Sequence, residues 1–199
     1  MATTGLQGLV ERLGLLAPPA ISLVNVQALL ADTVLDAREI DLFVEARPDR
    51  YARHLVHRTK WFDVIVLTWM PGQMTPIHNH AGNLGWVRLV RGRIVEERYQ
   101  LVPSTASQGL DVAGEVAAPR RGIELVSTGK TVVTEIGAIA TVDRQRAIHR
   151  LGNPKEHARD ETAVTLHVYS KPHDACLAFD QDTRTVTRRE MAFDNMIAL

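Results

Sequence analysis

Two histidines separated by a single residue, His78 and His80, are the residues whose types and spacing most clearly allow chemistry. Residues i and i+2 of a β-strand project from the same face, so on a strand both imidazoles reach one point. Neutral imidazole is the commonest metal ligand in proteins. The pair alone also fits two chance histidines on an exposed hairpin. Four further histidines lie among charged residues and are expected to be solvated: His54, His57, His157 and His173.

Glycines around this histidine pair favour metal binding. Five residues separate Gly72 from His78, and eleven separate His80 from Gly92, which resembles the spacing of the first sequence motif of cupins. The glutamate usual in that motif would fall at position 85, and here that residue is Gly85. The sequence therefore predicts a cupin metal site without its carboxylate ligand.

A third imidazole comes from His149, which precedes Asn153 by four residues, as at the end of the second cupin motif. Three neutral imidazoles leave a divalent ion its full charge and three positions on one octahedral face. Such a face suits a substrate that binds through two atoms, and it still leaves room for O₂. Because a soft thiolate is a natural partner for Fe(II), the pattern indicates a thiol-binding oxygenase.

Ordered motifs between Tyr51 and Asp182 resemble the cysteine dioxygenase family, in its bacterial form. Residues 51–56 resemble the family strand whose arginine grips the substrate carboxylate. Residues 163–170 are similar to the family's Ser-x-His-x-Tyr triad, with Thr165 where serine is usual. Residues 174–180 resemble its Asp-x-Cys-x-Ala-Phe-Asp stretch.

The resemblance implies a complete site around one Fe(2+) ion. Its metal ligands are His78, His80 and His149, its substrate-binding residues are Arg53 and Tyr51, and its catalytic residues are Tyr169, His167 and Thr165. Tyr169 is expected to place its hydroxyl near the iron, with His167 orienting that hydroxyl and Thr165 orienting His167. Trp69 fits either the core or the pocket wall. Cys176 is expected to be a small buried residue near the pocket, without a nucleophilic role.

The implied reaction is the oxidation of L-cysteine by O₂ to cysteine sulfinic acid. In animal members a cysteine crosslinks to the triad tyrosine, but Gly85 stands there in this chain, so no thioether to Tyr169 is expected. Residues 69–76 look more like the 3-mercaptopropionate dioxygenase branch, whereas Arg53 favours cysteine, because that branch often has glutamine there. Another small thiol, a non-catalytic metal-binding cupin sensor, and a cupin isomerase or decarboxylase stay as alternatives.

The elements that position these residues follow from hydrophobic periodicity. An apolar stripe at spacings of three and four predicts a first helix over 6–16, ended by two prolines. Ser22 is expected to cap a second helix over 23–30, and a third is expected over 37–45. Strands are predicted at 51–57, 62–69, 75–80, 86–93, 94–100, 124–127, 132–136, 147–150 and 163–169, with a long loop at 102–121.

Many short strands after a helical start predict a mainly β fold. We expect a cupin (jelly-roll) β-barrel with a short helical N-terminal region. Residues 1–48 would form the helical cap and residues 49–199 the barrel, and the two parts would together make a single domain.

Composition excludes several classes of protein. The 199 residues contain 23 Lys+Arg and 23 Asp+Glu, so no chain-wide positive field attracts nucleic acid or an anionic membrane. Cys176 is the sole cysteine, which excludes an intramolecular disulfide and zinc sites built from several thiolates. No apolar run has the roughly 18 residues that span a bilayer. We expect a cytoplasmic monomer that binds a small thiol and O₂, and neither nucleic acid nor membrane.

Overall fold

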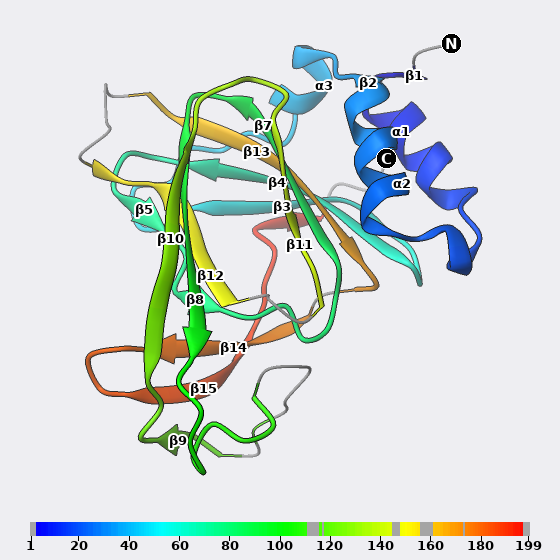
Figure 1. Cartoon of the computed structure of the whole chain (residues 1–199). Helices are drawn as coiled ribbons and strands as arrows, with labels where there is room; N and C mark the ends of the chain where they lie inside the picture. The colour runs from blue at the N-terminus through cyan, green and yellow to red at the C-terminus, as the bar shows by residue number, and fades with distance from the viewer. Residues whose placement is uncertain are drawn as a thin grey trace.

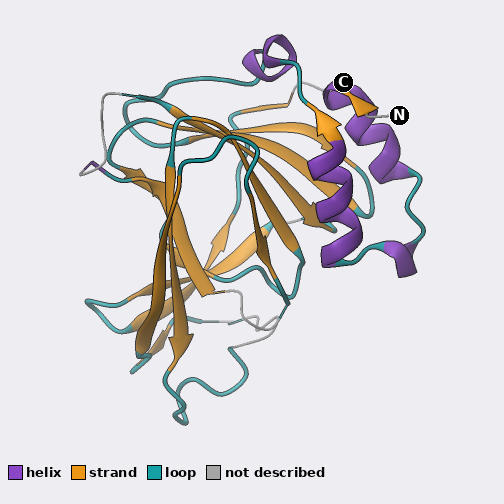
Figure 2. Ribbon diagram, turned by 45° about the horizontal axis from the view of Figure 1, so that its top comes forward, coloured by secondary structure: helices purple, strands orange, loops and turns teal. Residues whose placement is uncertain are grey.

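Two β-sheets face each other and form a barrel, and helices pack on one side of it (Figures 1 and 2). The structure is a computed structural model, and it describes residues 3–110, 116, 118–144, 148–155, 161–172 and 174–196. The predicted fold class, a mainly β cupin barrel with a short helical N-terminal region, is confirmed.

The first sheet holds eight strands and supplies His78 and His149. In spatial order its strands are β10 (Leu125–Val133), β8 (Ile94–Leu101), β12 (Ile148–Asn153), β6 (Ile77–His78), β14 (Ala175–Asp180), β15 (Thr185–Glu190) and β9 (Arg120–Arg121), and β5 (Gln73–Met74) also pairs with β12. The second sheet holds β11 (Ile139–Val142), β7 (Gly85–Arg91), β13 (Ala163–Ser170), β4 (Phe62–Trp69), β3 (Ala52–Arg58) and β16 (Asn195–Met196).

The central strands β13 and β4 of the six-stranded sheet are buried on both faces, and the alternation of their side chains decides which of them enter the barrel. On β13, Val164, Leu166 and Val168 pack against the helices. Side chains alternate along a strand, so Thr165, His167 and Tyr169 face the opposite way, into the barrel. All eight residues of β13 are buried for this reason.

Helices α1 (Gly5–Gly14) and α2 (Leu23–Asp32) cover the outer face of this sheet (Figure 1). Ser22 caps α2 as expected, because its hydroxyl accepts the backbone N–H of Asn25 at 3.2 Å. The remaining short elements are a 3₁₀ turn (Pro18–Ala20), α3 (Ala37–Asp41) and the paired strands β1 (Thr3–Thr4) and β2 (Thr33–Val34). No helix of the described residues is both long and apolar enough to span a membrane.

The third helix is shorter than predicted and ends at Asp41 instead of residue 45. Two backbone hydrogen bonds, from Phe43 to Ile40 and from Val44 to Asp41, tighten its end into a turn. The backbone N–H of Glu45 then donates to the Thr68 hydroxyl on β4 at 3.3 Å. This contact with the barrel therefore ends the helix. Hydrophobic periodicity within the segment cannot predict such a contact.

Several strand predictions were wrong, and the errors fall in both sheets. Residues 124–127 and 132–136 were predicted as two strands, but β10 is one strand with an irregularity between Ser127 and Gly129. Strands β11, β14 and β15 were not predicted. The polar sequence of β15, TVTRRE, gives no apolar run to find. Strands β3, β4, β7, β8 and β13 lie within about two residues of their predicted ends.

The expectation that His54 is solvated was wrong. Its side chain is buried on β3, with Nε2 3.2 Å from Oε2 of Glu45. The segment that leads from the helices into the barrel covers this strand, so a histidine in a charged stretch becomes enclosed. His57 is half-buried, and His157 and His173 lie outside the described residues.

Candidate metal centre and active site

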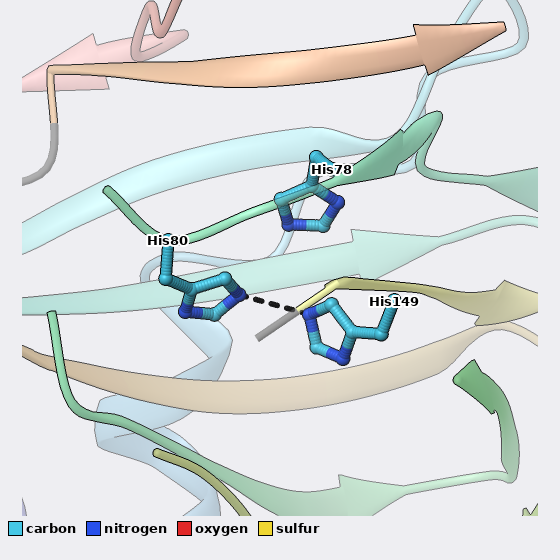
Figure 3. A group of neighbouring side chains, drawn as sticks. All are labelled: His78, His80 and His149. Atoms are coloured by element: carbon cyan, nitrogen blue, oxygen red, sulfur yellow. Dashed lines mark hydrogen bonds between the residues drawn. The ribbon is translucent and has the colours of Figure 1, made fainter. Parts of the chain in front are cut away.

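Three buried histidines converge between the two sheets (Figure 3). His78 ends β6 and pairs in register with His149 on β12, so the sheet itself sets these two side by side. Their ring centroids are 4.9 Å apart, and that of His80 lies 5.2 Å from His78 and 4.8 Å from His149. One ligand atom from each histidine lies within 4.8 Å of the others, a spacing that one metal ion can bridge.

The pair His78 and His80 converges by a different route from the predicted one. The expected strand over 75–80 is broken: β6 ends at His78, and His80 lies beyond it. Asn79 makes the connection, because its backbone N–H donates to the carbonyl of Leu177 and its side-chain oxygen accepts the N–H of Leu177 at 2.9 Å. The rings of His78 and His80 nevertheless stack at 18°, so the geometry does not need a regular strand.

Hydrogen bonds behind two of the rings decide which nitrogen faces the site. His78 donates from Nδ1 to the carbonyl of Pro76 at 3.0 Å, and His149 donates from Nδ1 to the Glu96 carboxylate at 2.8 Å. Carbonyls and carboxylates only accept, so in both rings Nδ1 carries the proton and Nε2 is the nitrogen suited to bind a metal. His149 Nε2 lies 2.9 Å from Nε2 of His80.

The donor set fits a transition-metal ion. Two imidazole nitrogens bound to one ion at about 2.1 Å, with bonds at right angles, lie about 3 Å apart, as these nitrogens do. Three buried neutral imidazoles suit iron, copper, nickel or zinc better than magnesium or calcium. The residues present therefore fit a bound divalent transition metal.

Glu96 is a site residue that the sequence did not reveal. It lies on β8, its side chain is buried, and it holds Arg98 at 3.0 Å as well as His149. Burial alone would raise the pKa of Glu96, but hydrogen bonds from His149 and Arg98 hold it below its ordinary value. The only sequence signal is a glutamate in the middle of a predicted strand.

We expect Glu96→Gln to weaken metal binding about 10- to 100-fold, because the amide orients His149 less firmly and adds no negative charge behind it. Competition with a chromophoric chelator measures the affinity for Fe(2+) or Co(2+). Glu97→Gln is the matched control, since Glu97 pairs with Arg150 and Lys130 and makes no contact with His149 among those described. Equal losses in the two variants would contradict the assigned role of Glu96.

A hydrogen-bonded chain leads along β13 to the metal site. The Trp69 indole N–H donates to the Thr165 hydroxyl at 2.9 Å, Thr165 Oγ1 lies 2.8 Å from His167 Nε2, and His167 Nδ1 lies 2.9 Å from the Tyr169 hydroxyl. The Tyr169 ring then meets the ring of His80 edge-on, with centroids 5.3 Å apart. The three residues predicted from the motif thus form one relay, and Trp69 extends it.

Burial sets the protonation states of this chain. It lowers the pKa of His167 to about 3, helped by the nearby Arg53 charge, so the ring is neutral at physiological pH. It raises the pKa of Tyr169 well above its ordinary value, so the phenol keeps its proton. Tyr169 therefore faces the metal site as a neutral hydrogen-bonding group.

Arg53 brings an unneutralised charge to the same pocket. Its side chain is buried, its Nη1 donates to the carbonyl of Ala192 at 3.3 Å, and its guanidinium lies over the Phe193 ring at 5.1 Å. Within the described part of the chain, no carboxylate lies within 4.0 Å of this guanidinium. A buried cation without an anion favours binding of an anionic ligand.

Five of the eight predicted site residues line one pocket between the sheets: Tyr51, Arg53, His78, His167 and Tyr169. His80 and His149 adjoin it through their ring contacts with His78, and Thr165 through its hydrogen bond with His167. Tyr51 stacks on Trp69 at 4.7 Å, which makes Trp69 both a core residue and a support for the pocket wall. Cys176 is buried and lines this pocket, as expected from the sequence. The structure adds Met191, in sulfur contact with Cys176 at 3.7 Å, and Arg189 on β15 opposite Cys176. Burial raises the pKa of Cys176 to about 11, which keeps it a thiol. Arg189 was missed because β15 was missed.

Comparison with known proteins identifies the family. A family profile described as "Cysteine dioxygenase type I" matches residues 2–182. The chain belongs to this family. The protein named "Cysteine dioxygenase type 1" of Homo sapiens is 26% identical over 187 residues, covering 93% of this chain and 83% of its own. The protein of that name from Danio rerio is 26% identical over 175 residues, covering 87% and 78%.

Solved structures with a similar fold share little sequence with this chain. A Klebsiella pneumoniae protein described as having a double-stranded β-helix domain superposes with a TM-score of 0.44 at 17% identity, covering 66% of this chain and 81% of its own.

Membership of the cysteine dioxygenase family, with three histidines placed for a metal, supports a metal-binding thiol dioxygenase.

In this member of the cysteine dioxygenase family, Gly85 lies directly beside Tyr169. The two residues pair across β7 and β13, and a Cβ at position 85 would lie 3.3 Å from Cε1 of Tyr169. Glycine offers no sulfur at this place, so we expect an intact mass without the loss of two hydrogens and a single band on a denaturing gel. A modified Tyr169 peptide in a tryptic digest would show another crosslinking partner.

Proposed function

We propose that this protein is an Fe(2+)-dependent dioxygenase that oxidises L-cysteine to cysteine sulfinic acid. The observation that carries the proposal is the shared pocket: the buried, carboxylate-free guanidinium of Arg53 and the ring of His78 line one cavity. A small molecule with a thiolate at one end and a carboxylate at the other matches that pair of groups.

Iron held by His78, His80 and His149 would supply the redox chemistry by which O₂ oxidises the thiol. The rest is done by residues of this chain. Arg53 holds the substrate carboxylate through a two-pronged hydrogen bond, which fixes the sulfur relative to the histidines. Both oxygen atoms enter the sulfinate, and sulfur gives up the four electrons that O₂ takes, so no external reductant is needed.

The relay on β13 would direct the Tyr169 proton toward the substrate. An indole N–H can only donate, so Thr165 accepts it and keeps its own proton for His167 Nε2. His167 then donates from Nδ1 to the Tyr169 oxygen, which leaves the phenol proton for a group in the pocket. In this arrangement Tyr169 stabilises developing negative charge on oxygen.

A second candidate substrate is 3-mercaptopropionate, and Arg189 is the observation that favours it. This second guanidinium at the pocket has no carboxylate within 4.0 Å among the residues described. It offers an additional anchor for a thiol acid whose carboxylate lies elsewhere than that of cysteine. Cysteine could offer a metal an amine as well as a thiolate, so we place it first.

Anaerobic reconstitution with Fe(2+), followed by thiol and O₂, tests the proposal. We expect cysteine to consume one O₂ and gain 32 mass units as sulfinate, with a higher kcat/KM than 3-mercaptopropionate. Iron binding without O₂ consumption would instead support a metal-binding sensor. Turnover of some other substrate without O₂ would support an isomerase or decarboxylase.

A further inference from the structure

The segment 192–194 holds Arg53 through both the backbone and the side chain of that arginine. The Asp194 side chain accepts the backbone N–H of Arg53 at 2.8 Å, and the Asp194 N–H donates to the Arg53 carbonyl at 2.8 Å. Ala192 accepts from the guanidinium, and Phe193 lies beneath it. These contacts bridge 139 to 141 residues of sequence, so they exist only in the folded chain.

Asp194 anchors this segment as an ionised, enclosed carboxylate. Its side chain is 2% exposed, Arg50 forms a close ion pair with Oδ1, and Arg47 lies 3.4 Å from the same oxygen. Burial by itself would raise the pKa of Asp194, but hydrogen bonds from Arg50 and the Arg53 backbone lower it overall. Asp194 takes up the charges of Arg50 and Arg47, while the guanidinium of Arg53 is left for another anion.

Phe193 is fixed from its other side by a second guanidinium. Arg58 lies 5.3 Å from the ring centroid and is itself held by Asp63 and Asp174, each at 2.7 Å. Cation–π contact favours the Arg53 guanidinium over the ring face without satisfying its hydrogen-bond donors. The guanidinium donors that the Ala192 carbonyl does not use therefore stay available, while the direction of the side chain is set.

We propose that Asp194 is a positioning residue for Arg53 and that, with Phe193 as the backing ring, it sets the selectivity of the pocket for thiols that carry a carboxylate. This inference rests on the proposed function, since it assumes that Arg53 binds the substrate carboxylate. Asp194 itself does not touch the substrate. It acts by holding the strand and the guanidinium where a carboxylate can be gripped in two places.

The test compares two thiols in full-length, iron-loaded protein. We expect Asp194→Ala to raise KM for cysteine about 10-fold or more, and to change kcat/KM for cysteamine, which has no carboxylate, by less than about 2-fold. The matched control is Asp182→Ala, an exposed aspartate in the turn between β14 and β15, and it should behave like the unsubstituted protein. Equal losses on both thiols, or none on either, would overturn the inference.

If Asp194→Ala folds poorly, a second variant and a second measurement still test the inference. Phe193→Leu keeps apolar volume but removes the ring face, and we expect the same selective rise of KM for cysteine with an unchanged iron content. In metal-free Asp194→Ala, hydrogen exchange at the Arg53 amide should accelerate, and an unchanged rate would count against the contact. Failure of the unsubstituted protein to oxidise any thiol would sink the proposed function, whereas unselective losses in an active enzyme would sink only this inference.

Discussion

Replacing His149 by alanine is expected to remove nearly all bound iron and, with it, dioxygenase activity. Loss of one of three imidazoles leaves two donors, His78 and His80, and it leaves the buried Glu96 carboxylate without its hydrogen-bond donor at 2.8 Å. Both changes weaken iron binding, because the ion loses a ligand and Glu96, which keeps its ion pair with Arg98, no longer supports a ligand. Metal content after anaerobic loading and desalting, measured by mass spectrometry, gives the result.

Thermal unfolding gives an independent measurement of the loss of iron binding in His149→Ala. A ligand at about 100 times its Kd stabilises the folded state by about 2.7 kcal/mol, so added Fe(2+) should raise the Tm of the unsubstituted protein. We expect no such rise for His149→Ala. His57→Ala, a half-buried histidine on β3, serves as the control and should keep both iron and the Tm shift. Near-stoichiometric iron in His149→Ala would refute the ligand assignment.

Local sequence patterns predicted those parts of the site that depend on short-range geometry. Alternation along one strand was enough to place Thr165, His167 and Tyr169 on a common face, and the structure connects them by hydrogen bonds of 2.8 and 2.9 Å. The helix start at Ser22 was predictable for the same reason, since a cap involves only neighbouring residues. The glycine at the end of the second motif, by contrast, has a cause distant in sequence: β12 pairs with β5, and a Cβ on Gly152 would lie 2.2 Å from the carbonyl oxygen of Gln73.

Parts of the site that depend on distant pairing were not predictable. Arg189 reaches the pocket only because β15 pairs with β14. The polar sequence of β15 has no hydrophobic periodicity from which this strand could be predicted. Glu96 becomes a partner of His149 only through the pairing of β8 with β12. Burial of His54 depends on Glu45, in the segment that crosses from the helices to the barrel. Motif spacing identifies the candidate ligands and catalytic residues, but the pairing of distant strands decides which residues contact and support them.

The last expected result concerns selectivity and depends on Arg53. Charge-assisted hydrogen bonds contribute roughly 1.5–3 kcal/mol each, so losing a two-pronged grip costs about 3–6 kcal/mol of transition-state binding. Arg53→Ala should therefore lower kcat/KM for cysteine by at least ~10²-fold. Cysteamine should be a poor substrate of the unsubstituted enzyme and lose little in the variant.

Two companion variants separate charge from geometry. Arg53→Lys keeps a cation but loses the planar fork, so we expect it to recover only part of the lost kcat/KM. Arg189→Ala removes the other guanidinium at the pocket, and it should affect cysteine less than Arg53→Ala does if Arg53 is the carboxylate anchor. If Arg189→Ala has the larger effect, and kcat/KM for 3-mercaptopropionate exceeds that for cysteine, Arg189 is the residue that binds the substrate carboxylate. The substrate assignment would then be overturned, while a thiol dioxygenase built on His78, His80 and His149 would stand, because those ligands do not depend on which guanidinium binds the acid.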